Sequence, residues 1–322
     1  MVKIGVLGGD KISHAHLSVL QELDDFDITG FYAPDPNNAS KILSKFNVPQ
    51  FTDIETLIQH SDAIDIASST VPHYKCAELT LRNTKHLFIE NPVTSTIEEA
   101  RKLLNLTHEA DVKVQIGNVE RFNPAFTAIV PLIDHPICIE TKRMLKFNVN
   151  KTFRSVVLDL MIHDIDLILS IVNSNVRKVN AHGLALTNGS PDYVNARVEF
   201  DNGCIVTLSA SRISFKDDIN LTVYQKDSTY FVDLLNKKCE TLNIKGIKNL
   251  KVNAGSINPN ELYFNYPKIK ESNIIKEELN SFAHAIINNT DTSVTIEEGC
   301  LAIEVANRIL EKLKLNPNLI ED

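Results

Sequence analysis

Three ionisable side chains interrupt an otherwise apolar stretch near the middle of the chain. The stretch from Val156 to Val172 is apolar nearly all round, which predicts a buried helix, yet it carries Asp159, His163 and Asp166. Their spacing places the three side chains on one face of that helix. Because an unpaired buried charge costs several kcal/mol, this face should line a polar cleft or pair internally.

A histidine flanked by carboxylates can serve as a general acid or base, because one of the acids fixes the orientation of its ring. The alternative interpretation is a purely structural hydrogen bond between His163 and an aspartate. A metal site ranks below both, since the chain offers no obvious further ligands at a useful spacing.

A second chemical signal lies at the N-terminus, where the strand Val2–Leu7 runs into a turn and a helix. This layout is typical of a dinucleotide-binding turn, whose three glycines allow the tight turn, the approach of the pyrophosphate and helix packing. Only Gly8 matches, and Asp10 occupies the second glycine position. A carboxylate roughly 5 Å from a phosphate costs about 3 kcal/mol at a dielectric constant of about 20, which Lys11 could partly offset. Alternatively Asp10 caps the following helix, and both interpretations can hold together.

Strands and helices alternate in the N-terminal part of the chain, which predicts a parallel, doubly wound α/β sheet. Pro34-Asp35-Pro36 ends the second strand, and Ser95 with Glu98 fits a capping box. The predicted strands are Val2–Leu7, Phe26–Ala33, Ala63–Ala67, His86–Ile89 and Val112–Ile116, and the predicted helices are Ile12–Leu23, Ile54–His60, Tyr74–Asn83 and Ile97–Glu109.

From Ala181 to Leu235 the pattern changes to alternating strands without helices between them, which predicts an antiparallel meander. Its strands are expected at Tyr193–Phe200, Cys204–Ile213, Leu221–Tyr224 and Thr229–Leu234, with a turn at Asp201-Asn202-Gly203. Residues 237–270 show little periodicity and are expected to be loop and irregular strand. Two amphipathic helices follow, and Thr295 with Glu298 forms a second capping box.

The composition is that of a globular protein with a large core. The chain has 322 residues, of which 43% are hydrophobic, and this length predicts two domains. A net charge of -8 without clustered Lys and Arg excludes a generic nucleic-acid surface. Five scattered cysteines predict reduced thiols in the cytoplasm, and no apolar run approaches the length of a membrane span.

Several motifs in order resemble the glucose-fructose oxidoreductase, inositol dehydrogenase and rhizopine catabolism (Gfo/Idh/MocA) family of nicotinamide-dependent sugar and cyclitol oxidoreductases. The resemblance implies an N-terminal Rossmann domain over residues 1–119 and, over 120–322, a substrate domain with an open, mainly antiparallel sheet. It also implies final helices that pack back on the Rossmann domain, and a homo-oligomer, dimer or tetramer, formed through the sheet. The motifs are residues 2–16, Asp65-Ile66-Ala67, His73-Tyr74, residues 86–92, Glu98-Glu99-Ala100, residues 117–124, residues 158–166 and Asn202-Gly203.

Carried over by position, the resemblance implies catalytic roles for His163, Asp159 and Asn91. His163 would be the acid/base and Asp159 its orienting acid. Asn91 stands where the family usually has a lysine that hydrogen-bonds the reacting hydroxyl and keeps the histidine neutral. Asn91 can position a hydroxyl but brings no charge, so the nearby acids favour protonated His163, a poorer base for oxidising an alcohol.

The resemblance also implies NAD or NADP as cofactor, although the chain does not clearly select between them. Ala33 stands where the family commonly has the acid that holds the adenosine ribose; Asp35 could substitute for it or be a turn residue. No arginine follows to bind a 2'-phosphate. The implied cofactor contacts are Gly8, Gly9, Asp10, Lys11, Ile12, Asp35, Ser69, His73 and Glu90, and the implied substrate contacts are Asn118, Arg121 and Asp166. Arg121 could equally be a structural ion-pair partner.

Two functions follow from these residues. The first is hydride transfer between a nicotinamide cofactor and a secondary alcohol carbon of a sugar or nucleotide sugar. The second is a catalytically silent relative that keeps the scaffold for ligand sensing or assembly, with the lost lysine, glycines and ribose acid as tolerated losses.

Overall fold

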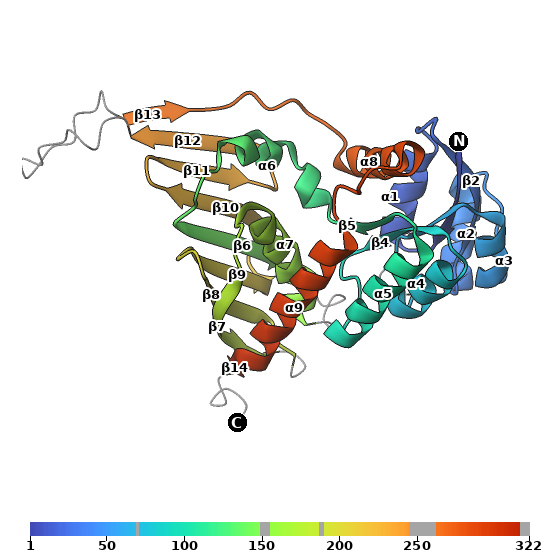
Figure 1. The fold of residues 1–322 in the computed structure, drawn as a ribbon, viewed down its shortest axis with the longest axis horizontal. Coiled ribbons are helices and arrows are strands. Elements are labelled where there is room, and N and C mark those ends of the chain that lie inside the picture. Colours follow the sequence, from blue (N-terminus) through green and yellow to red (C-terminus); the bar gives the residue numbers. More distant parts are fainter. Residues whose placement is uncertain (69–70, 149–154, 187–189, 245–261, 316–322) are drawn as a thin grey trace, which may run out of the picture. The chain divides into compact units, whose positions relative to one another are not determined.

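The chain forms two compact units (Figure 1). The computed structural model describes residues 1–68, 71–148, 155–186, 190–244 and 262–315. Unit 1 comprises Met1–Phe122 and Ser272–Glu304, and unit 2 comprises Asn123–Glu271 and Val305–Asp322. The helices near the C-terminal end therefore contribute to unit 1, although they lie far from its strands in the sequence.

Unit 1 contains a five-stranded parallel sheet with the strand order β2-β1-β3-β4-β5, which confirms the predicted doubly wound α/β fold. The strands are β1 (Val2–Leu7), β2 (Phe26–Tyr32), β3 (Ala63–Ile66), β4 (His86–Glu90) and β5 (Val114–Gly117). The helices are α1 (Lys11–Leu20), α2 (Pro36–Lys45), α3 (Ile54–His60), α4 (His73–Arg82), α5 (Ile97–Ala110) and α8 (Ile274–Asn288), with a short 3-10 turn at Val119–Phe122.

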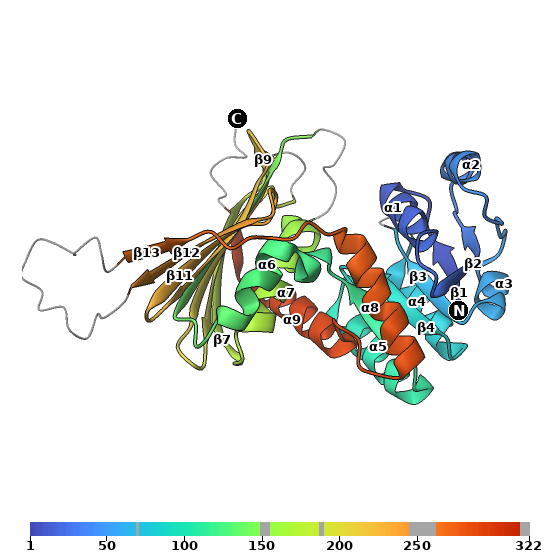
Figure 2. The same ribbon diagram turned by 90° about the horizontal axis from the view of Figure 1, so that it is seen from above.

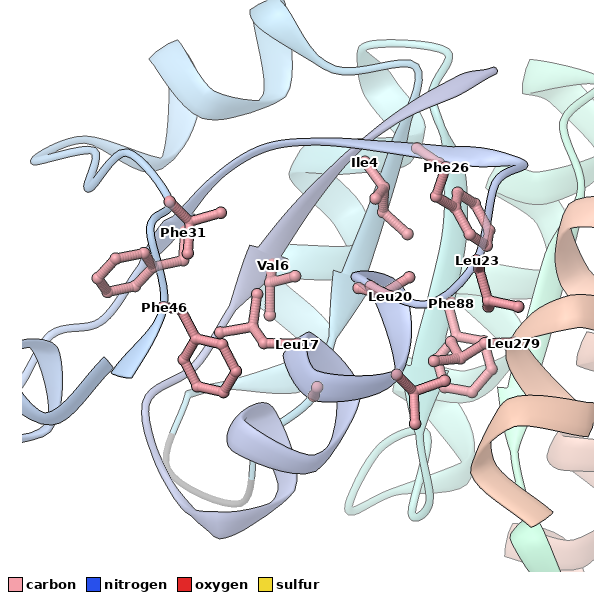
Figure 3. Close-up of a cluster of buried hydrophobic side chains, with 14 of the residues drawn as sticks. Ile4, Val6, Leu17, Leu20, Leu23, Phe26, Phe31, Phe46, Phe88 and Leu279 are labelled. Atoms are coloured by element: carbon pink, nitrogen blue, oxygen red, sulfur yellow. The ribbon is translucent and has the colours of Figure 1, made fainter. Parts of the chain in front are cut away.

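Side-chain alternation in the strands determines which helix packs on which face of this sheet. Ile4 and Val6 of β1 belong to the same buried cluster as residues of α1 and α8, as Figure 3 shows for Leu17, Leu20 and Leu279. A Cβ placed on Gly5 would instead point at Leu57 of α3. Helices α1 and α8 therefore cover one face of the sheet, and α3 packs on the opposite face.

Two local predictions in unit 1 are wrong. Helix α2 was not predicted, although Asp35 caps it and Pro36 occupies its first turn, the positions these residue types favour. The capping residue of α5 is Thr96, whose side chain accepts a hydrogen bond from the amide of Glu99, rather than Ser95 with Glu98. The first error omits a whole helix and the second shifts the start of one, and neither changes the order of the strands.

Unit 2 is built on a nine-stranded mixed sheet with the order β13-β12-β11-β10-β6-β9-β8-β7-β14. Most neighbours are antiparallel, as predicted, but β6 pairs in parallel with β9 and β14 in parallel with β7. Strand β6 lies between β9 and β10, so the predicted simple meander is wrong at this point. The strands are β6 (Cys138–Lys146), β7 (Val176–Leu184), β8 (Tyr193–Phe200), β9 (Ile205–Ser214), β10 (Asp218–Gln225), β11 (Ser228–Asp233), β12 (Lys238–Ile244), β13 (Leu262–Asn265) and β14 (Leu313–Leu315).

Helices cover one face of the second sheet, where α6 (Pro124–Ile129) and α7 (Ile162–Ile171) lie on the same side (Figure 2). The predicted continuous helix Val156–Val172 begins instead as a π-helical segment, Val157–Met161, which is continuous with α7. Residues 237–270 were expected to be irregular, yet β12 and β13 form a paired hairpin, with residues 245–261 between them outside the described part.

Helix α9 (Ile296–Lys312) begins at the predicted capping box: the Thr295 amide donates to Glu298 and the Glu298 amide donates to the Thr295 hydroxyl. Within the described residues, no helix is both long and apolar enough to span a membrane. All five cysteines are free thiols.

Candidate functional site

The turn after β1 has the backbone that a dinucleotide site needs. Gly8 adopts a φ of 140°, and a Cβ there would lie 2.4 Å from the Ser13 hydroxyl and 2.5 Å from the Ser68 Cβ. Gly9 is also crowded, because a Cβ would lie 2.9 Å from that of Ala33. Only glycine can occupy position 8, because of its positive φ and the lack of space for a Cβ. This confirms that the tight turn after β1 requires the first glycine of the motif.

The carboxylate of Asp10 occupies the first turn of α1. Its Oδ1 accepts hydrogen bonds from the amides of Ile12, at 3.0 Å, and Ser13, at 3.4 Å. The Ser68 hydroxyl donates to Oδ2 at 3.2 Å. Free amides at a helix N-terminus are the groups that bind phosphate in dinucleotide sites. The helix-capping interpretation of Asp10 is therefore confirmed, and the cap uses amides that a pyrophosphate would need.

At the end of β2 lie Ala33, at the position of the expected ribose acid, and Asp35, its predicted substitute. Ala33 is buried, and Asp35, two residues on, accepts a hydrogen bond from the Asn37 amide at 2.9 Å as the cap of α2. The predicted ribose contact by Asp35 stays a prediction, with its carboxylate already used as a helix cap. Lys11 is exposed, Ile12 is half-buried, and Ser69 lies outside the described residues.

Asn91 follows β4 at the carboxyl edge of the parallel sheet, where ligands bind in open α/β folds. It is half-buried. Its backbone amide donates a hydrogen bond to the Gly117 carbonyl at 3.2 Å, which links the ends of β4 and β5. Within the described residues, its Oδ1 is buried and has no hydrogen-bond partner. A buried polar oxygen of this kind favours a ligand donor, because an unsatisfied group costs about 1–3 kcal/mol.

The ring of His73 bridges the two loops next to Asn91. Its Nδ1 contacts the Pro92 carbonyl at 2.8 Å, and its Nε2 contacts the Ser68 carbonyl. His73 therefore supports the segments that follow β3 and β4. The predicted cofactor contact by His73 stays a prediction.

A buried ionic group beneath this edge was missed by the sequence analysis. His16 of α1 contacts Asp65 of β3 through Nδ1, at 2.9 Å, and Glu90 of β4 through Nε2, at 3.1 Å. The carboxylate of Glu90 therefore points into unit 1, so the cofactor contact expected of Glu90 is not supported by the direction of its side chain. The available signal was Asp65, a charged residue inside an otherwise apolar strand.

Asn118 and Arg121, the predicted substrate contacts of unit 1, are each held by an acid of the C-terminal helices. The Asn118 amide donates to Oε1 of Glu278 at 2.6 Å. The guanidinium of Arg121 donates to Glu298 at 3.0 Å. The ion-pair alternative for Arg121 is thus present in the structure, and its substrate role stays a prediction.

In unit 2, the three ionisable side chains predicted to share one helix face are buried to different extents. Asp159, in the π-helical segment, is exposed, His163 at the start of α7 is half-buried, and Asp166 is buried. Asp164 was not predicted to matter, yet it is 1% exposed and accepts from Nη2 and Nε of Arg143 on β6, at 2.8 and 3.0 Å. This ion pair anchors the start of α7, and hence His163, on the sheet, because breaking one partner of a buried pair costs roughly 3–5 kcal/mol.

The residues of unit 1 fit a nicotinamide dinucleotide in backbone shape. Gly8 provides the turn, α1 presents its N-terminus, and Asn91 offers an unsatisfied oxygen. The group that opposes the fit is the Asp10 carboxylate, which must move or share the amides of α1. The described residues hold no cluster of three or more His, Cys, Asp or Glu side chains that could bind a metal.

Comparison with known proteins agrees with this geometry. A family model described as the GFO/IDH/MocA oxidoreductase family with an NAD-binding Rossmann fold matches residues 2–118, and a model of that family's C-terminal domain matches residues 142–230. The chain is 26% identical over 236 residues to a UDP-N-acetylglucosamine 3-dehydrogenase of Acidithiobacillus ferrooxidans, covering 73% of this chain and 75% of that one.

Other relatives extend over nearly the whole chain. A myo-inositol 2-dehydrogenase of Thermotoga maritima is 22% identical and covers 94% of this chain and 93% of its own. A crystal structure of the Acidithiobacillus ferrooxidans UDP-N-acetylglucosamine 3-dehydrogenase superposes with a TM-score of 0.88 at 21% identity, covering 97% of both chains. The same fold therefore spans both units.

Proposed function

Because the chain belongs to the Gfo/Idh/MocA family and is an NAD(P)-dependent oxidoreductase, we propose that it acts on a secondary alcohol carbon of a sugar or nucleotide sugar. The nicotinamide supplies or accepts the hydride when it is bound. The residues of the chain must then hold the cofactor, orient the alcohol and move its proton. The observation that carries the proposal is the retained pair of Asp159 and His163 at the start of an otherwise apolar helix.

The proton is assigned to His163. Its half-buried position on α7, next to an aspartate anchored by Arg143, restricts its orientation and leaves it accessible to a ligand. Asp159, which is exposed, is proposed to orient the ring when the ligand is bound. Asn91 is proposed to accept a hydrogen bond from a substrate hydroxyl through its buried Oδ1.

A nucleotide sugar is the substrate class that we favour. The support is the Acidithiobacillus ferrooxidans UDP-N-acetylglucosamine 3-dehydrogenase, which is similar in sequence over 73% of this chain. Inositols and glucose 6-phosphate are the next candidates, because other relatives are named for them. A cytoplasmic location stays a prediction.

The test is to measure turnover of UDP-N-acetylglucosamine, myo-inositol and glucose 6-phosphate with NAD and with NADP. The appearance of NADH or NADPH reports the reaction. We expect reduction of one cofactor with the nucleotide sugar. Binding of a sugar or cofactor without turnover on the whole panel would favour the catalytically silent alternative. Two features support that alternative: the Asp10 carboxylate accepts a hydrogen bond from an amide of α1, and Asn91 stands where the family usually has a lysine.

Restoring the lysine should increase oxidation of the alcohol. Asn91→Lys restores the residue that the family usually has at this position, where the cation hydrogen-bonds the reacting hydroxyl and favours a neutral acid/base histidine, and it should raise kcat by about tenfold. The control is Asn105→Lys on the exposed side of α5. Initial rates at neutral pH measure the change, and a kcat of Asn91→Lys no higher than that of the control would show that the missing charge does not limit the reaction.

We also infer a homo-oligomer, dimer or tetramer, formed through the outer face of the unit 2 sheet. Phe231 and Tyr224 are each 38% exposed on this face, whereas Tyr230 and Val232 of the same strand β11 point to the buried face. Placing a charge at such an interface costs several kcal/mol when it is unpaired. Phe231→Glu should therefore weaken self-association at least tenfold, and Leu43→Glu on α2 should not. Sedimentation equilibrium measures both, and a monomeric wild type would reject the inference.

A further inference from the structure

Four ionisable side chains meet on the face of the unit 1 sheet that α1 and α8 cover, and we call them the buried acid cluster. They are His16 of α1, Asp65 of β3, Glu90 at the end of β4 and Glu278 of α8. Asp65 and Glu278 are fully buried, His16 is 1% exposed and the Glu90 side chain is 13% exposed. Such a group is costly unless its charges balance.

The cluster holds one base for three acids. His16 contacts one carboxylate through each ring nitrogen, Asp65 at 2.9 Å and Glu90 at 3.1 Å. Burial lowers the pKa of His16, but the two carboxylates outweigh this effect and raise the pKa well above its usual value. A protonated His16 balances the negative charge of one of the two carboxylates that it contacts. The net charge of the cluster is therefore about -1 if the third acid is neutral and about -2 if it is ionised.

Glu278 is that third acid, and its surroundings disfavour ionisation. Its Oε1 accepts from the Asn118 amide at 2.6 Å, while its Oε2 is buried and has no hydrogen-bond partner within the described residues. Burial, then the charge of Glu90 and that of Asp65, raise the pKa of Glu278, and they outweigh His16 and the Asn118 amide. The pKa lies well above the usual value for a glutamic acid.

The backbone of β5 makes room for this arrangement. A Cβ on Gly117 would lie 2.8 Å from the carboxyl carbon of Glu90, so only glycine lets that carboxylate lie beside β5. Nearby, Phe88 of β4 packs against Phe282 of α8 with ring centroids 5.7 Å apart, and Leu279 belongs to the same cluster (Figure 3). This packing fixes α8 against β4 close to Glu278.

We propose that Glu278 is a neutral carboxylic acid in the folded protein, and that its hydrogen bond with the backbone amide of Asn118 makes it a positioning residue for Asn91. A fully buried carboxyl group whose second oxygen lacks a hydrogen-bond donor in the described part of the chain disfavours the ionised form, and the negative charges of Glu90 and Asp65 add to this effect. Oε1 of Glu278 joins α8 to the end of β5, because it accepts from the amide of the Gly117–Asn118 peptide. The carbonyl of the same peptide accepts from the backbone amide of Asn91. Asn91 is the residue after Glu90, so the cluster sets the backbone from which its side chain projects.

The protonation of Glu278 is tested by stability as a function of pH. Above about pH 4.3 the unfolded chain releases this proton, whereas the folded chain keeps it. The equilibrium constant for folding of the wild type therefore falls by up to tenfold for each unit of increasing pH. Glu278→Gln reproduces the neutral acid, because its Oε1 can accept from the Asn118 amide and the side chain binds no proton in this pH range. The Tm of Glu278→Gln minus that of wild type should therefore rise by roughly 3–5 °C per unit between pH 5 and 7.

The matched control is Glu277→Gln, which changes the exposed neighbour on the same helix. Its Tm difference from wild type should stay nearly constant over this pH range. A Glu278→Gln difference that is constant or falls with pH would overturn the proposal, because it would mean that Glu278 is ionised in the folded protein.

The positioning role is tested by kinetics, and this part depends on the proposed function. Glu278→Gln should keep kcat within about threefold of wild type, whereas Glu278→Leu should lower kcat roughly ten- to hundredfold with little change in KM. A general loss of structure would instead appear in the Tm of Glu278→Leu and in the fraction of active protein. Equal kcat values for the Leu and Gln variants would overturn the positioning role.

The two failures are distinguishable. If wild type shows no turnover but the Tm difference rises with pH, the proposed function fails and the neutral acid is supported. If wild type turns over and the Tm difference does not rise, the neutral acid is rejected and the proposed function is unaffected.

Discussion

His163→Asn should lower kcat by about 10³-fold, within the 10²- to 10⁴-fold range that positioned proton transfer contributes. Asparagine keeps a polar side chain of similar size at the start of α7, so the helix and the Arg143–Asp164 ion pair should remain. It cannot take or give a proton near neutral pH. The loss should therefore appear in kcat and kcat/KM together, as expected for a group that acts in the transition state.

The measurement is steady-state turnover with the preferred cofactor and sugar, accompanied by an NADH titration. Cofactor affinity should stay within about twofold, because the glycine turn belongs to unit 1 and the substitution removes no group there. His135→Asn is the control: this histidine of unit 2 is 94% exposed, and its φ of 50° suits asparagine. A His163→Asn enzyme that retains most of its kcat would remove His163 as the acid/base.

Asp10→Gly should tighten NADH and NADPH binding by about 100-fold. The variant removes a negative charge, which costs about 3 kcal/mol at roughly 5 Å from a phosphate and a dielectric constant of about 20. It also frees the amides of Ile12 and Ser13, which now donate to Asp10 Oδ1. Replacing the cap by glycine should cost only a few tenths of a kcal/mol in helix stability.

Asp10→Asn separates the two effects, because it removes the charge and keeps an oxygen that can cap the helix. Its affinity should lie between wild type and Asp10→Gly. The control is Asp53→Asn, which changes the cap of α3 in the same way and should leave cofactor binding unchanged. Isothermal titration with NADH and NADPH gives the dissociation constants. Equal or weaker binding by both Asp10 variants would show that the carboxylate does not oppose the pyrophosphate.

Cofactor binding by Asp10→Gly and turnover by the wild type together show what the departures of this chain from its family do. Tighter binding by Asp10→Gly with active wild type would mean that Asp10 weakens cofactor binding without abolishing the reaction. Tighter binding by Asp10→Gly with an inactive wild type, together with no gain from Asn91→Lys, would favour the catalytically silent alternative.

The fold was predictable because its signals are local and repeated. The apolar runs of β1, β3 and β4 alternate with amphipathic helices, and this alternation alone leads to the doubly wound sheet. The capping box at Thr295 and Glu298 was also readable, since both partners lie within one turn. Helix α2 was missed because its apolar face is short, with only Ala39 and Ile42 buried.

The site was predictable only in part. Gly8, Asp10 and His163 were predicted from residue types and spacing, and Asn91 from the resemblance to the family; the roles of these residues in catalysis and cofactor binding stay predictions. The π-helical segment was not predicted, because a shift from four to five residues per hydrogen bond leaves no clear mark in an apolar sequence. Asp159, which lies in this segment, is exposed, whereas His163 is half-buried and Asp166 is buried.

The sequence by itself determined the alternation of strands and helices in the N-terminal part of the chain and the glycine turn with Asp10 at its second glycine position, because each depends on residues that are neighbours along the chain. The missing lysine at Asn91 followed from the resemblance to the family. Tertiary structure alone decided that Asp10 occupies the α1 amides together with Ser68 and that Glu278 meets Asn118 across 160 residues of chain. The physical reason is that the charge state of a buried acid depends on the groups packed around it, and those groups come from α1, β3, β4 and α8.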